Sequence, residues 1–565
     1  MHMTSQFAGP RVSSNSATES HDKLALTLIG GAIAVCLLLQ LHLVFNQPVN
    51  WDEFRFLADV HSYERGELSA PLLTFQVHLF SWLTGIGNEV SQIRFARLIM
   101  MALELATLAL IAAAARRFFG LPAAICGALA YISFSFVLQH GASFRFDPLV
   151  TFWLMAGVYL LLGRKLRWTS MLIVGLSLAM ATMISIKIAL ALPLVAAIGI
   201  YRIAAVPNRR TCAKLAVAAL SAAVFLAILY AWHLSTLAGA SNEAAEAHLG
   251  ASYSKTLREI PFFPRLSYFL RSLIENPLHW LLLLLGISAV LSAYRRDRKR
   301  ALLLLSFLLP LLSVLFYRNA FPYFYSFVLA PAAVLFAAAA DRLELRRLIG
   351  PIAVLLAAGG VIHQQRALSD AAQEQRQTVA AVHRIFPNPV SYLDRCSMIA
   401  SFPQAGLFMS SWWIENYVAA GRPVMRELLI EKAPVFVIAD SPLLADALEG
   451  PSRIKTDALF LPDSATLHSN YVHHWGPIWV AGKALNLTEA GRATEFLIPG
   501  RYKLESAGPI RLDGQSVHPG ASLLISAGAH RLTSSAGDQS VILRWAAAGP
   551  VNQPDIPRRL EFGRF

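Results

Sequence analysis

The chain has 565 residues, of which 55% are hydrophobic and 15% are charged, and its mean hydropathy is +0.49. Soluble globular chains carry about 25% charged residues, so this composition predicts a polytopic membrane protein and excludes an ordinary soluble one. The formal net charge of +14 does not indicate nucleic-acid binding. Its Lys and Arg residues cluster in short loops between apolar runs, without a basic stripe interleaved with aromatic residues.

Apolar segments along the chain predict about eleven transmembrane helices. A run of roughly 18 apolar residues is a candidate span, because about 20 helical residues cross the hydrocarbon core of a bilayer. Residues 1–23 are polar and are expected to form a disordered tail, and the first apolar run is too long for a signal-peptide core. The predicted spans cover residues 24–45, 95–115, 121–139, 148–163, 169–186, 188–203, 213–234, 277–294, 301–317, 323–340 and 348–363.

The basic clusters predict the orientation of these spans. They fall in every second loop, beginning with Arg116-Arg117, and short loops rich in Lys and Arg stay cytoplasmic. The N-terminus is therefore expected inside, and the segments around residues 46–94, 140–147, 187, 235–276 and 318–322 outside. Residues 53–84 are expected to form juxtamembrane helices in the membrane interface, since two amphipathic stretches there are too short to span.

Everything after about residue 364 is expected outside as a soluble region. Residues 364–477 mix a helical pattern with short apolar strands such as 435–439, which predicts a small α/β layer. Residues 478–565 have short alternating runs divided by Gly and Pro, which predicts a β-sandwich.

The first pair of acids stands directly after the first span, at Asp52 and Glu53. Carboxylates at a membrane edge indicate function, and a base that deprotonates a sugar hydroxyl must be a carboxylate in a partly buried site. The alternative is structural, since Asn50 or Asp52 at the start of a helix also fits an N-cap.

Other charged and aromatic residues are sorted to the same outer face. Arg145 is suited to hold a phosphate, whereas Asp147 before Pro148 also fits a helix cap. Lys187 lies between two apolar segments, where a cation needs a partner, a cavity or a route to the interface. Arg318 precedes the aromatic residues Tyr323 and Tyr325, which fit either a sugar pocket or an interfacial belt.

Several kinds of chemistry have no motif in this sequence. His78 and His140 are isolated, there is no His/Cys/Asp spacing typical of zinc, and no Gly-rich phosphate loop occurs. A reactive donor is therefore expected to arrive through the membrane with its own leaving group. A sugar on a polyprenyl phosphate fits, because cations bind the phosphate and a carboxylate activates the acceptor.

At this point the sequence resembles the GT-C superfamily of lipid-linked-sugar glycosyltransferases. It looks closest to the bacterial branch with the aminoarabinose transferase of lipid A and the protein O-mannosyltransferase-like proteins. The resemblance covers residues 24–363, but Ser69-Ala70-Pro71-Leu72 stands where the aminoarabinose branch has a Lys-Pro-Pro run. It rests on Asp52-Glu53 after span one, Arg94 and Arg97 at span two, the stretch from Arg116 to Ala130, Arg145-Phe-Asp147-Pro148, and Phe321-Pro-Tyr-Phe-Tyr325.

The resemblance implies an inverting transfer from a polyprenyl-phosphate sugar to an envelope glycan, lipid or protein, on the periplasmic side of a bacterial inner membrane. It implies that Asp52 is the general base, that Glu53 and Asp147 are accessory acids, and that Lys187 is a basic position of the site. No cofactor is expected, although clustered acids also suit a divalent cation. The expected substrate-binding residues are Arg55, His78, Arg145, Lys187, Arg318, Tyr323 and Tyr325.

Two other functional classes remain as alternatives. A lipid or glycolipid transporter or flippase needs inverted repeats and charges near the bilayer centre, whereas the charges here collect at one face. An assembly protein with a glycan-binding soluble region does not need Asp52, Lys187 and Arg318 together at the membrane edge.

Overall fold

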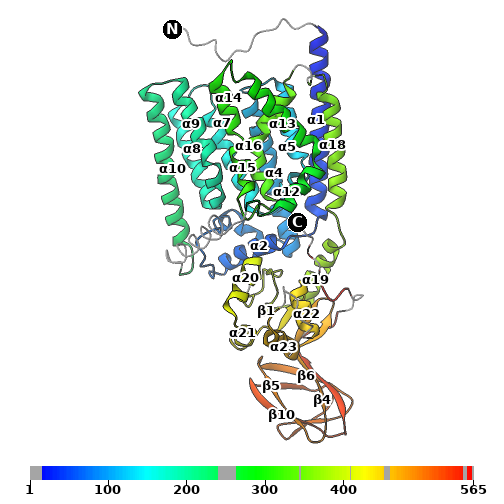
Figure 1. Ribbon diagram of the computed structural model, residues 1–565. Coiled ribbons are helices and arrows are strands. Elements are labelled where there is room, and N and C mark those ends of the chain that lie inside the picture. Colours follow the sequence, from blue (N-terminus) through cyan, green and yellow to red (C-terminus); the bar gives the residue numbers. More distant parts are fainter. Residues whose placement is uncertain are drawn as a thin grey trace.

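A bundle of apolar helices forms one half of the molecule, and a mixed helix-and-sheet region extends from one end of it (Figure 1). The computed structural model describes residues 16–239, 262–342, 345, 347–406, 409–450, 459–551, 556–560 and 562. Residues 1–15 of the predicted tail and residues 240–261 of the long outer loop lie outside this described part.

Each predicted span coincides with one helix or with two or three shorter helices. The first helix begins at Ser16, within the segment predicted as a disordered tail. The helices of the bundle are α1 (Ser16–Asn46), α4 (Glu89–Ala115), α5 (Leu121–Ile132), α6 (Ser135–His140), α7 (Phe146–Leu161), α8 (Trp168–Ile184), η2 (Ile186–Ala191), α9 (Leu192–Ala205), α10 (Arg209–Ser235), α12 (Leu266–Glu275), α13 (Pro277–Ala293), α14 (Arg298–Ser306), α15 (Leu309–Leu312), η4 (Ser313–Leu315), α16 (Phe324–Ala340) and α18 (Ile349–Arg366).

Four of these segments are long and apolar enough to cross a membrane, within the part of the chain that the structure describes. Including the sharply bent pair α12 and α13 as one span raises this number to five, and four shorter apolar helices accompany them. The molecule is therefore a membrane protein, and the number eleven stays a prediction.

Helix α16 occupies the centre of the bundle, and all of its residues are buried. Its sequence is rich in Ala, and glycines on the neighbouring helices face its backbone. A Cβ on Gly286 of α13 would lie 2.0 Å from the Leu335 carbonyl oxygen, and one on Gly127 of α5 would lie 2.8 Å from that of Ala333. Small residues allow helices in membranes to approach this closely. Helix α16 is therefore stabilised by close backbone packing against α5 and α13.

The residues between α1 and α4 form short helices across one end of the bundle (Figure 1). They are α2 (Trp51–Glu64), α3 (Val77–Phe80) and η1 (Ser81–Gly85). The apolar side of α2, including Phe54, Leu57 and Val60, is buried against protein. The second of the two predicted juxtamembrane stretches is helical from Val77, and turns and bends precede it.

The C-terminal region, residues 371–562, contains helices packed on two sheets. Its elements are α19 (Ala371–Ile385), β1 (Tyr392–Leu393), α20 (Ser411–Ala420), α21 (Met425–Lys432), β2 (Phe436–Ile438), α22 (Pro442–Glu449), α23 (Leu461–Asn470), β3 (Tyr471–Trp475), β4 (Ile478–Leu487), β5 (Arg492–Phe496), β6 (Gly500–Ser506), β7 (Ile510–Leu512), β8 (Gln515–Val517), β9 (Ser522–Ile525), β10 (Gly528–Ser534) and β11 (Gln539–Trp545).

Strand β4 joins the two parts that the sequence predicted as separate. The larger sheet runs β1-β2-β4-β11-β6-β9, with β3 also on β4, and the smaller runs β5-β10-β7-β8. The first half of β4 pairs with β2 and β3, and its second half pairs with β11. The expected α/β layer and β-sandwich therefore share one continuous sheet across the predicted boundary at residue 478.

Candidate functional site

The loop that carries Asp52 is fixed by a helix cap. Asn50 is the N-cap of α2: its side chain accepts a hydrogen bond from the Asp52 N–H at 3.0 Å, and its own N–H donates to Glu53 at 2.9 Å. This reciprocal arrangement is a capping box, which satisfies otherwise unpaired amides of the first turn. The predicted cap at Asn50 is therefore confirmed, and it fixes the first turn of α2, which carries Asp52.

Asp52, Arg145, Asp147 and Lys187 lie together at the end of the bundle next to α2. Arg145 Nη1 donates to Asp52 Oδ2 at 2.5 Å, and Arg145 Nε lies 3.7 Å from Asp147 Oδ2. Lys187 Nζ donates to Asp147 Oδ1 at 2.7 Å. Two acids and two bases from α2, α7, η2 and the turn before α7 thus alternate along one chain of contacts.

Tyr323 covers this charged chain from the start of α16. The Arg145 guanidinium carbon is 3.5 Å from the centre of the Tyr323 ring, and Lys187 Nζ is 5.0 Å from it. Cations over an aromatic face are attracted by its quadrupole, more strongly when they are shielded from water. The predicted residues Asp52, Arg145, Asp147, Lys187 and Tyr323 therefore meet in one site.

Exposure separates the acids of this site. The Asp52 side chain is 22% exposed, whereas those of Asp147 and Glu53 are each 1% exposed. Lys187 is 12% exposed and Arg145 is 5% exposed. Asp52 is therefore the most exposed of these three carboxylates, while Asp147 is buried in contact with both cations.

Glu53 faces away from this site and into the bundle. Arg97 of α4 donates to its two carboxylate oxygens at 2.8 and 2.5 Å, and the Phe144 N–H donates at 2.8 Å. Burial by itself raises the pKa of Glu53, but the Arg97 charge and these hydrogen bonds outweigh burial and lower it. Its contacts favour a structural role, in which Glu53 fixes the start of α2 against α4 and the Arg145 turn.

The structure places other predicted residues outside the site. Arg55 forms an ion pair with Asp59 at 3.0 Å on its own helix. His78 shares a hydrogen bond of 2.8 Å with His233 and lies over Trp232. The Arg55 ion pair lies within α2, and the His78 contacts join α3 to α10.

Two further predicted residues, Tyr325 and Arg318, make contacts outside the group of four charged residues. Tyr325 is fully buried, stacked on Phe134 and edge-on to Phe136, so it belongs to the core of the bundle. Arg318 reaches the C-terminal region, where its Nη2 lies 2.5 Å from Glu415 Oε1.

Arg265 was not predicted as a site residue, although it extends the aromatic surface around Tyr323. Its guanidinium carbon is 4.2 Å from the centre of the Phe321 ring, and Phe321 stacks on Tyr323 at 5.7 Å. Its Nε donates to the Arg318 carbonyl oxygen at 3.0 Å. The sequence placed Arg265 in a long outer loop, and only the fold brings that loop next to residue 321.

One cluster in the C-terminal region has the composition of a metal site. Ligand atoms of Asp394, Cys396 and Asp440 lie within 4.8 Å of one another. Burial raises the pKa of all three groups, and the Cys396 thiol donates to Asp440 Oδ2 at 3.2 Å. Backbone N–H groups also donate to both carboxylates. The three side chains are therefore held in place by hydrogen bonds, and their raised pKa values favour the protonated forms.

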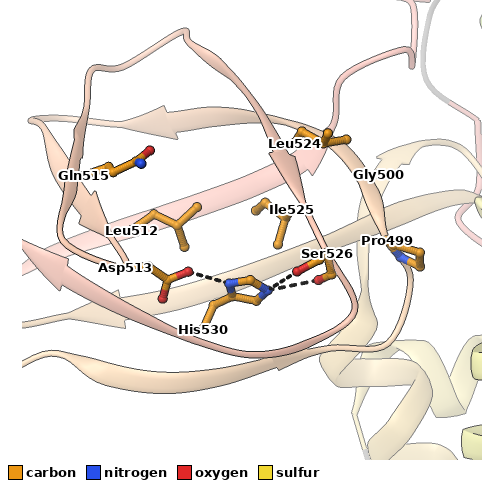
Figure 2. A pocket seen from close by; sticks show the side chains of 9 residues that line it. All are labelled: Pro499, Gly500, Leu512, Asp513, Gln515, Leu524, Ile525, Ser526 and His530. Carbon is orange, nitrogen blue, oxygen red and sulfur yellow. Dashed lines mark hydrogen bonds and ion pairs between the residues drawn. The ribbon is translucent and has the colours of Figure 1, made fainter.

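A hollow of about 520 Å³ lies between strands of the larger and the smaller sheet (Figure 2), far from the bundle (Figure 1). In it His530 Nδ1 is 2.6 Å from Asp513 Oδ2, and His530 Nε2 is 3.2 Å from Ser526 Oγ. The order resembles that of a nucleophilic serine site, but Nε2 is also 3.0 Å from the Ser526 carbonyl oxygen. With the Nδ1–H donating to Asp513, Nε2 accepts the Ser526 hydroxyl proton in the neutral imidazole and donates to the Ser526 carbonyl oxygen in the protonated imidazole.

No protein-family model matches the sequence, and no curated protein is significantly similar to it. The fold, however, is similar to that of ArnT from Cupriavidus metallidurans bound to undecaprenyl phosphate, with a TM-score of 0.54 and 14% identity over 77% of this chain and 96% of that one. The apo state of the same protein gives a TM-score of 0.52 with the same identity and coverage. An archaeal oligosaccharyltransferase from Archaeoglobus fulgidus matches 89% of this chain and 76% of its own at a TM-score of 0.48 and 12% identity. The chain therefore shares its fold with ArnT, as the resemblance found in the sequence led us to expect.

Proposed function

We propose that this GT-C-fold chain is a membrane glycosyltransferase that moves a sugar from a polyprenyl-phosphate donor to an envelope glycan, lipid or protein. The observation that carries the proposal is a carboxylate, Asp52, that is partly exposed and held beside the two cations Arg145 and Lys187. The undecaprenyl phosphate bound by ArnT supports a lipid-phosphate leaving group for the same fold.

In this proposal Asp52 is the general base of an inverting transfer. A hydroxyl of the acceptor attacks the anomeric carbon from the face opposite the phosphate, and its proton passes to the Asp52 carboxylate. The bond between the anomeric carbon and the phosphate oxygen breaks, and its electron pair leaves with the polyprenyl phosphate. A positioned base contributes typically 10²–10⁴-fold to such a rate.

Arg145 and Lys187 stabilise the charge that develops on the departing phosphate. Both cations are largely buried, so their interaction with a phosphate is weakly screened by water. Asp147 orients them, since its two carboxylate oxygens face Lys187 and Arg145 separately. The Tyr323 ring covers both cations and limits the directions from which the phosphate approaches.

The reaction is assigned to the face of the membrane that carries the C-terminal region, which the distribution of Lys and Arg predicts to be periplasmic. On this assignment the protein resides in a bacterial inner membrane with its N-terminus in the cytoplasm. Donor and acceptor then meet between the bundle and the C-terminal region, at the first turn of α2.

The test compares envelope glycolipids and glycans by mass spectrometry in a strain that lacks the chain. The strain is complemented with the wild type, with Asp52→Asn, or with Glu64→Gln, an acid-to-amide change at an exposed position of the same helix. The expected result is that one sugar mass is lost on deletion, and that the wild type and Glu64→Gln restore it while Asp52→Asn does not. Restoration by stably produced Asp52→Asn would refute the assignment of the base.

A further inference from the structure

Residues on both sides of Asp52 are held by the C-terminal region. Before it, Gln375 of α19 binds the Val49 backbone twice: its Oε1 accepts the Val49 N–H at 2.8 Å, and its Nε2 donates to the Val49 carbonyl oxygen at 2.9 Å. Val49 and Gln375 are both buried. A side chain that satisfies both polar groups of one residue fixes that residue's position and direction.

The indole of Trp51, adjacent to Asp52, lies against Arg395. The Arg395 guanidinium carbon is 4.2 Å from the centre of the Trp51 ring. Arg395 is itself immobilised, since its Nε donates to the Met409 carbonyl oxygen at 2.9 Å and its backbone N–H donates to the Asp440 carboxylate at 3.0 Å. The buried cluster of Asp394, Cys396 and Asp440 thus anchors the turn that presents Arg395 to Trp51.

A third contact follows Asp52 along α2. Phe562 lies edge-on to Phe54, with ring centres 6.1 Å apart. Two residues before Phe562, the Leu560 N–H donates to the carbonyl oxygen of Ala439, the residue directly after β2, at 3.0 Å. Three separate parts of the C-terminal region therefore touch residues 49, 51 and 54, with Asp52 between them.

From this arrangement we propose that Gln375 and Arg395 are positioning residues for Asp52, and that the C-terminal region completes the reaction centre. The inference rests on the proposed function, because it assigns a purpose to the placement of the base. The bundle holds the Asp52 carboxylate through Arg145, whereas the C-terminal region holds the backbone from which that carboxylate extends. A misplacement of about 1 Å at a reacting group can cost on the order of 10²-fold in rate.

The test measures sugar transfer by the full-length chain in lipid nanodiscs, with lipid extracted from the deletion strain as the donor. Gln375→Ala and Arg395→Ala are expected to lower the maximal rate per folded chain by about 10–100-fold and to leave the half-saturating amount of donor unchanged. Arg395→Lys keeps a cation over the indole and is expected to recover part of the rate. Arg426→Ala is the matched control, since Arg426 is an exposed arginine of the same region that pairs with Glu495.

A second measurement does not depend on activity. Hydrogen–deuterium exchange is expected to be faster at the amides of residues 49–54 in Arg395→Ala than in the wild type or in Arg426→Ala, while the later turns of α2 keep their protection. Unchanged exchange there, or maximal rates within twofold of the wild type in both alanine variants, would overturn the inference. Absence of transfer by the wild type would instead refute the proposed function, and the exchange result would still decide the positioning.

Discussion

The buried pair of Arg97 and Glu53 gives the sharpest prediction for stability. In Arg97→Met the Glu53 carboxylate, 1% exposed, loses its two hydrogen bonds from Arg97 and keeps those from the Asn50 and Phe144 amides. The Arg97 guanidinium also donates to the Val44, Gln47 and Pro48 carbonyl oxygens at 3.0–3.2 Å, so these lose a donor too.

Removing one partner of a buried ion pair costs about 3–5 kcal/mol, because the other charge stays buried without compensation. Arg97→Met is therefore expected to lower the free energy of unfolding by about that amount. Arg94→Met is the matched control on the same helix. Arg94 donates to the Phe45 carbonyl oxygen at 2.6 Å in an exposed position, so its loss is expected to cost at most about 1 kcal/mol.

The assay is unfolding of the full-length chain in mixed micelles with increasing SDS, followed by far-ultraviolet circular dichroism. A double variant with Glu53→Gln is expected to lose less stability than the sum of the two single variants, because the second change removes the stranded charge. Equal losses in Arg97→Met and Arg94→Met, or additive effects in the double variant, would refute the reasoning.

Three further results are expected. Lys187→Gln removes a cation from the proposed phosphate site and should lower sugar transfer in nanodiscs by roughly 10²–10³-fold, whereas Lys187→Arg should retain part of it; an unaffected rate would contradict the proposed role. The hydrogen bond with Glu89 raises the pKa of His383 above 6.5 despite partial burial, so this contact stabilises fully below pH 6.5 and its contribution falls as the pH rises through the raised pKa. His383→Gln should abolish this part of the pH dependence of thermal unfolding, and an unchanged profile would count against it. Burial raises the pKa of Asp440, so the wild type should lose stability as the pH rises above the usual range of an aspartate, and Asp440→Asn should flatten that loss; equal slopes in both proteins would exclude the cluster as its source.

The sequence predicted which charged residues share one face of the bundle, because hydropathy and the placement of Lys and Arg are local signals. Asp52, Arg145, Asp147 and Lys187 were grouped in this way and lie in contact in the structure. The same signals could not separate Asp52 from Glu53, which are adjacent in sequence. Their surroundings differ because a helix turns about 100° per residue. The Asp52 side chain therefore faces Arg145, whereas the Glu53 side chain faces Arg97.

Contacts between segments that are far apart in the chain could not be predicted from the sequence. Nothing local to Arg395 or Gln375 marks them as neighbours of Trp51 and Val49. Sheet pairing crosses the predicted boundary at residue 478 for a related reason: a strand longer than its partners can pair with two sets of neighbours, and β4 pairs with strands from both sides. Periodicity identifies a strand, but the pairing of strands is a property of the complete chain.

The contact between Phe54 and Phe562 has a consequence for how the molecule is made. Phe54 lies on the helix that carries Asp52, and Phe562 comes far later in the sequence, so α2 is synthesised long before this neighbour. During that interval the bundle is inserted but its outer end lacks a cover. On the proposed function, a nascent chain is expected to stay inactive until the C-terminal region has folded and docked, so that an incomplete site does not hydrolyse lipid-linked sugars.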